Sequence, residues 1–176
     1  MHAGIKEVSG IKVSDHLVVA GQELPLNGTG VRFRGPFRVS VAALYVNQKV
    51  TTAEAFFAAR GPKRLTLTML RDVDASEMGH LFVRGIQGNT PPGAMSKVMP
   101  ALPRMGDIFA QQKKLAPGDV LMLDWVPQVG MVVTAKGKTI GEPFRDPEFF
   151  EAMLNIWLGK SPADWMLKDA LLARNI

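Results

Sequence analysis

The feature that most constrains this chain is the stretch GTGVRFRGPFRVSVAALYV at residues 28–46, where an arginine-rich segment runs into an apolar one. Residues 39–46 are almost uninterrupted β-formers, which predicts a strand buried on both faces. Arg32 stands at the mouth of this strand. An arginine there either extends along the surface into water or anchors an anion in an apolar pocket.

Composition narrows the class of protein. The chain has 176 residues, of which 47% are hydrophobic and 21% charged, so we expect one globular domain over residues 1–176. No apolar run approaches the roughly 20 residues that a membrane-spanning helix needs. The formal net charge is +5, yet no block of basic residues occurs, so we expect no nucleic-acid partner. Arg32, Arg34, Arg38 and Lys49 form a local basic cluster, which is either a solvated strand edge or an anion-attracting surface.

Recognisable catalytic motifs are missing from the sequence. There is no cysteine, which excludes disulfides, zinc thiolates and cysteine nucleophiles. His2, His16 and His80 lack metal-ligand spacing, and neither a phosphate-binding loop nor a Gly-x-Ser-x-Gly motif is present. We therefore predict no cofactor, no metal and no catalytic residues.

The start of the chain bears on localisation. No apolar segment of a signal peptide follows Met1, but His2-Ala3-Gly4 is similar to the end of a small-residue cleavage site. We therefore expect a periplasmic or otherwise exported protein.

Periodicity and capping signals predict the secondary structure. Residues 53–60 follow a threonine cap, the capping box at 74–77 opens a helix that ends before Pro91, and Pro147 opens another that stops at Gly159. Pro100 and Pro103 should interrupt a helix over 94–112, and a last helix should follow residues 161–164. Asn27-Gly28 predicts a turn. Strands are expected at 11–19, 39–46, 64–69, 119–126 and 129–135.

These elements follow no regular strand–helix–strand alternation. Such an order favours the α+β class, with a large curved antiparallel sheet covered by helices on one face. Gly79, Gly85 and Gly88 within the helix after residue 74 indicate either close packing on the sheet or room for a bulky ligand.

The order of several short segments along almost the whole chain resembles the chalcone isomerase-like family, in particular its bacterial branch. The matching segments are residues 26–32, 41–46, 63–73, 118–127, 137–138 and 156–159. The resemblance implies an open-faced β-sandwich with a ligand cleft between the sheet and its helices.

The resemblance also implies a set of site residues. Arg32 matches the arginine that holds the anion in the plant enzymes, and Ser40 falls where a strand threonine lies. Phe82 and Asn89 match a helical tyrosine and asparagine, and Ile156 matches a late threonine. Two hydroxyls that would polarise a ketone are thus replaced by hydrocarbon, and each such donor contributes about 10²–10³ in rate.

Three hypotheses follow from this residue set. The leading one is a non-catalytic protein that binds a hydrophobic, anionic small molecule such as a fatty acid, with Arg32 on the head group. Ser40 and Asn89 would then add polar contacts, while Phe82 would line the cavity for the chain of the ligand. The alternatives are an isomerase or lyase acting on an unsaturated carbonyl compound such as a chalcone, and an interaction or scaffold protein with a collapsed cleft. The oligomeric state stays open.

Overall fold

A computed structural model describes residues 4–174. Its centre is an antiparallel seven-stranded sheet with the order β11-β10-β9-β6-β5-β4-β3. The strands are β3 (His16–Val19), β4 (Gln22–Arg34), β5 (Phe37–Tyr45), β6 (Lys63–Met69), β9 (Val120–Val126), β10 (Gly130–Ala135) and β11 (Lys138–Thr139). Two small sheets pair β1 (Ile5–Val8) with β2 (Ile11–Ser14) and β7 (Val73–Asp74) with β8 (Lys114–Leu115).

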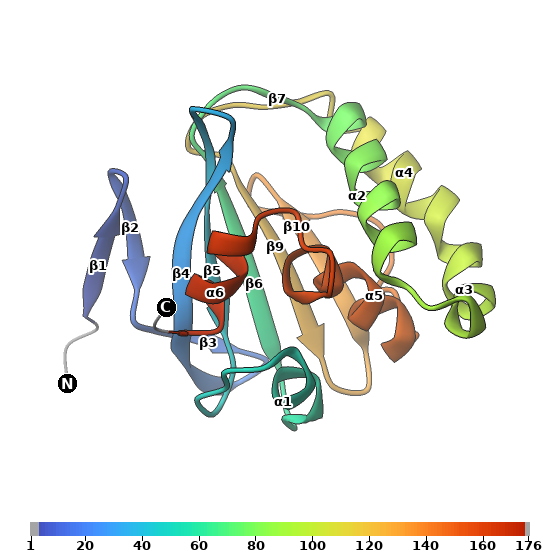
Figure 1. Ribbon diagram of the computed structural model, residues 1–176, viewed down its shortest axis with the longest axis horizontal. Coiled ribbons are helices and arrows are strands. Elements are labelled where there is room, and N and C mark those ends of the chain that lie inside the picture. The colour runs from blue at the N-terminus through green and yellow to red at the C-terminus, as the bar shows by residue number, and fades with distance from the viewer. Residues whose placement is uncertain (1–3, 175–176) are drawn as a thin grey trace.

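Helices are packed on the sheet, and the first β-hairpin lies apart from them (Figure 1). They are α1 (Ala53–Ala58), α2 (Ala75–Asn89), α3 (Pro92–Val98), the 3₁₀ turn η1 (Met99–Ala101), α4 (Leu102–Ala110), α5 (Pro147–Leu158) and α6 (Trp165–Leu171). The predicted α+β class, with a large antiparallel sheet and covering helices, is confirmed.

Capping residues and prolines in the sequence predicted where most of the helices begin or end. Thr52, Asp74 and Asp146 accept backbone hydrogen bonds as N-caps of α1, α2 and α5. The segment holding Pro100 and Pro103 divides into α3, η1 and α4, as the two prolines predict. Within the described residues, no helix combines the length and apolarity needed to cross a bilayer. His2 and Ala3, on which the expectation of export rests, lie outside the described residues.

Strand β5 is buried on both faces, as predicted. Ala42 and Leu44 point into the main core under the helices, whereas Val41, Ala43 and Tyr45 join a second core. The second core is completed by side chains of β2, β3 and β4 on the opposite face. Alternation along a strand sends neighbours to opposite faces, so both sides of β5 need a cover.

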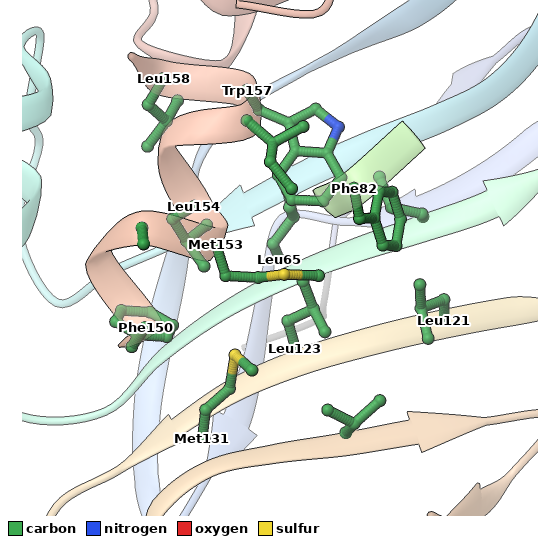
Figure 2. Packing of buried hydrophobic residues seen from close by; sticks show 14 of the residues in the cluster. Leu65, Phe82, Leu121, Leu123, Met131, Phe150, Met153, Leu154, Trp157 and Leu158 are labelled. Atoms are coloured by element: carbon green, nitrogen blue, oxygen red, sulfur yellow. The ribbon is translucent and has the colours of Figure 1, made fainter. Parts of the chain in front are cut away.

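The main core lies between the sheet and α5. Figure 2 shows Met153, Leu154 and Trp157 of α5 above sheet residues such as Leu65 and Leu123. All five are buried, and a fully buried side chain of this size stabilises the fold by about 1.5–3 kcal/mol. This packing fixes α5 on the sheet.

Asn27-Gly28 does not form the predicted turn. Both residues lie within β4, where the pairing with β5 is irregular between Leu26 and Gly28. The Asn27 side chain is buried and donates to the carbonyls of Val50 (3.0 Å) and Leu171 (2.8 Å) while accepting from the Val50 amide (2.8 Å). These long-range bonds stabilise the extended backbone over the local turn preference.

Helix α6 lies directly on β4. A Cβ atom built at Gly28 would overlap the carbonyl oxygens of Ala170 and Leu171, and one at Gly30 would come within 2.9 Å of the Ala170 Cβ. At the start of α6, Asp164 accepts from the Leu167 amide and from the Phe33 amide of β4, each at 3.1 Å. Glycine and these side-chain bonds together seat α6 on the sheet.

We therefore expect Gly28→Ala to lower the free energy of unfolding by about 1–3 kcal/mol, since the added methyl group displaces α6. Gly106→Ala is the matched control, because its Cβ would meet open space inside α4. That control should raise stability by about 0.5–1 kcal/mol. Urea unfolding of both variants measures the difference, and a Gly28→Ala protein as stable as wild type would contradict the packing described.

Candidate functional site

Arg32 projects from β4 toward the helical layer. It stands opposite Ser40 of β5, which in turn stands opposite Met69 of β6. Ser40 is two residues from Ala42, so it shares the face of β5 that carries the main core. The predicted partners Arg32 and Ser40 are therefore side by side, on the helix-covered face.

A cavity of about 350 Å³ opens beside this pair. It lies between the ends of β4, β5 and β6 and helix α2, and Ser40, Met69, Phe82 and Trp157 line it together with Arg32. Small-molecule sites span roughly 300–1,000 Å³, so the cavity has the size of a modest ligand site. Hydrocarbon side chains line it together with the arginines Arg32, Arg34 and Arg71 and the carboxylates Asp72, Asp74 and Glu77, a mixture that suits an amphipathic molecule.

A second hollow of about 160 Å³ continues on the other side of Arg32. Arg32, Leu81 and Phe82 line both spaces, while Gly85 and Ile156 line only the second. A Cβ at Gly85 would lie 3.0 Å from Ile156 Cγ1, so this glycine lets α2 approach α5 closely. Gly88, in contrast, faces open space.

The guanidinium of Arg32 lacks a full set of partners. Among residues 4–174, no acceptor reaches its buried Nε. Burial lowers the pKa of Arg32, the Asp164 carboxylate raises it and Arg34 lowers it further. A buried donor without an acceptor costs free energy, and an ion-pairing ligand would supply both the acceptor and the missing charge.

Charged side chains of both signs form the rim. Arg71 lies over the Phe37 ring at 4.4 Å, and Asp72 is 3.7 Å from Lys114 Nζ. Asp74 accepts from the Glu77 amide as the cap of α2. The charged side chains of the rim are exposed, whereas Arg32 is half-buried beside the apolar wall of the cavity.

Phe82 and Ile156 are buried in the wall. The Phe82 ring packs against the rings of Trp157 and Phe109, with centroid distances of 5.4 Å and 5.3 Å. Figure 2 shows Phe82 next to Trp157 of α5. Ile156 extends the wall into the second hollow. The family resemblance predicted both positions as site residues. Leu81 and Met69 also line the cavity, but the sequence marked them only as apolar positions of an amphipathic helix and strand.

The structure does not bring Asn89 to this cleft. Its Nδ2 donates to the carbonyls of Gly85 (2.8 Å) and Ser161 (3.0 Å), and its Oδ1 accepts from the Ser161 amide (2.8 Å). The amide group thus ties the end of α2 to the loop after α5. The predicted polar contact from Asn89 to a ligand is corrected accordingly, because its hydrogen-bonding groups serve the backbone.

With this geometry in place, comparison with known proteins identifies the family. A family model described as chalcone isomerase-like matches residues 5–173. The chain belongs to the chalcone isomerase-like family. The resemblance noted from short sequence segments is therefore confirmed over nearly the whole chain.

Structural comparison agrees with this assignment. A crystal structure of a fatty-acid binding protein from Arabidopsis thaliana aligns with a TM-score of 0.69, covering 97% of this chain and 96% of that one. The two sequences are 12% identical, so the likeness establishes the shared fold. No curated protein sequence matches the chain.

We expect Asn89→Ala to lower the free energy of unfolding by about 1–3 kcal/mol, because two backbone groups of Ser161 lose their partner. Ligand affinity at Arg32 should stay the same. Thermal unfolding and a binding titration on one sample measure both effects. Gln87→Ala, which changes an exposed residue of the same helix, is the control. If Asn89→Ala lost ligand affinity without losing stability, Asn89 would contact the ligand directly after all.

Proposed function

We propose that this protein binds a hydrophobic molecule with an anionic head group, such as a fatty acid, and does so without catalysis. The observation that supports this most strongly is the buried, unpartnered Nε of Arg32 at the junction of two hollows. A carboxylate there would accept from the guanidinium, with the Ser40 hydroxyl opposite on the neighbouring strand.

The shape of the site agrees with an amphipathic ligand. The charged group lies between the larger cavity and the smaller hollow, and hydrocarbon side chains of α2 and α5 border both. An alkyl chain leaving Arg32 would therefore meet Phe82 in either direction. The fatty-acid binding protein of the same fold supports this ligand class.

The wall chemistry supports binding rather than turnover. Phe82 and Ile156 stand at positions where the family resemblance implies a tyrosine and a threonine, and both present only hydrocarbon to the hollows. Closing a flavanone ring on a chalcone would develop negative charge on the ketone oxygen, which these side chains cannot stabilise.

Arg32→Met should weaken binding of dodecanoate by about 1.5–3 kcal/mol, roughly tenfold to a hundredfold. Binding of uncharged 1-dodecanol should change little, because methionine keeps the apolar stem and removes only the charge. Competition with a fluorescent fatty acid measures both affinities. Arg84→Met, an exposed arginine on α2, is the matched control and should bind both ligands as wild type does.

An equal loss of dodecanoate and dodecanol affinity would contradict the role of the charge. Incubation with a chalcone provides the other decisive outcome, since turnover abolished by Arg32→Met would establish an enzyme instead.

Arg32→Met should also stabilise the ligand-free protein, which a purely structural arginine would not do. Burial lowers the pKa of Arg32, yet the guanidinium stays protonated in the folded and unfolded states at ordinary pH. The cost of burying it therefore applies throughout that range. We expect the free energy of unfolding to rise by about 1 kcal/mol. This is the lower end of the cost of an unsatisfied buried donor, because the Arg32 side chain is only half-buried. Urea unfolding without ligand tests this, and a marked loss of stability would show that Arg32 supports the fold.

A further inference from the structure

The hairpin that joins β4 and β5 carries exposed aromatic side chains. Phe33 is 42% exposed and Phe37 is 55% exposed, although phenylalanine has no polar group to hold in water. They flank the turn at Gly35-Pro36, at the tip of the hairpin that β4 and β5 form (Figure 1). They belong to successive cross-strand pairs, so apolar side chains are exposed on both sides of the hairpin tip.

The start of α6 extends this apolar surface. Trp165 is 60% exposed and Met166 is 76% exposed. The preceding residue, Asp164, accepts from the Phe33 amide at 3.1 Å, so the beginning of α6 adjoins the hairpin. Elements far apart in the chain thus bring large apolar side chains to one end of the molecule. We call Phe33, Phe37, Trp165 and Met166 the tip surface.

Basic side chains surround the tip surface. Arg34 pairs with Phe37 across the hairpin, and Arg38 pairs with Phe33. Both arginines are exposed, and residues 28–38 include no acidic residue. Lys168 lies 5.2 Å from the Trp165 ring and adds a further positive charge. The Asp164 carboxylate beside the hairpin is engaged as the cap of α6 and by the Phe33 amide, while Asp72, Asp74 and Glu77 line the cavity next to Phe37.

We propose that the tip surface docks onto the surface of an anionic lipid bilayer. Phenylalanine, tryptophan and methionine side chains bury their hydrocarbon at the boundary between head groups and acyl chains. Arg34 and Arg38 meet the negative lipid phosphates. Stacking on nucleic acid would use the aromatic rings but not Met166, the most exposed of the four, so the mixture favours a bilayer.

The docking surface adjoins the mouth of the cleft. Arg34 and Phe37 line the larger cavity and also belong to the hairpin that would contact lipid. A molecule leaving the bilayer would therefore reach Arg32 with little exposure to water. Docking itself needs no ligand, so its test stands apart from the test of the proposed function.

Sedimentation with vesicles of phosphatidylcholine, with and without phosphatidylglycerol, tests the proposal on ligand-free protein. Binding should require the anionic lipid and weaken as salt is raised, because salt screens exposed charges. Arg38→Glu should weaken it at least about fivefold, the effect of one basic residue near such a surface. Arg60→Glu, exposed at the opposite end of the sheet, is the charge-matched control.

The apolar part of the surface is tested by Phe33→Ser together with Trp165→Ser. Neither residue lines a described cavity, so this variant should bind dodecanoate in solution as wild type does yet lose vesicle binding. Val18→Ser with Val129→Ser removes exposed apolar side chains elsewhere and should leave both unchanged. Circular dichroism confirms that each variant is folded.

Arg32→Met separates the two proposals, since it should lose dodecanoate affinity and keep vesicle binding. Equal binding to neutral and anionic vesicles, or no binding to either, would overturn the docking proposal. Binding of a single-stranded oligonucleotide without vesicle binding would replace the bilayer with a nucleic-acid partner.

Discussion

Burial of β5 on both faces is the constraint on which the rest of the structure depends. Ala42 and Leu44 require the helical layer, while Val41 and Tyr45 require a second cover built from the first strands. Strands β4 and β6 pair with the two edges of β5, so side chains opposite each other on these strands point to the same face of the sheet. Arg32 is carried to the helical side by this register, opposite Ser40.

The cleft forms where the helical layer stops covering the sheet. Helix α6 lies close on β4 over Gly28 and Gly30, and Asp164 ties its start to the strand near Phe33. Helices α2 and α5 meet closely at Gly85 but leave space at the end of the strands. The two contacts leave Arg32 between hollows, half-buried and short of acceptors. An unsatisfied buried donor costs stability, and it is the feature on which the proposed binding function rests.

Part of the candidate site could be predicted from the sequence. Arg32 was singled out because it precedes an apolar strand, whereas Ser40, Phe82 and Ile156 were named from the family resemblance alone. The structure places all four in the walls of adjoining hollows. The sequence could not show that Asn89, unlike these residues, lies away from the cleft. Spacing along a helix does not reveal which backbone groups a side chain will bind. Two of its three hydrogen bonds join it to Ser161, which lies in a loop 72 residues further along the chain, and the third joins it to Gly85 of its own helix.

The sequence alone determined the antiparallel α+β architecture, the helix caps and the proline breaks, since apolar period and capping chemistry act over a few residues. Tertiary structure decided the rest. Asn27-Gly28 lies within a strand because Val50 and Leu171 supply partners that a local turn could not match. Likewise, only packing could show that Arg32 lacks an acceptor, since burial and hydrogen bonding depend on every element that surrounds a side chain.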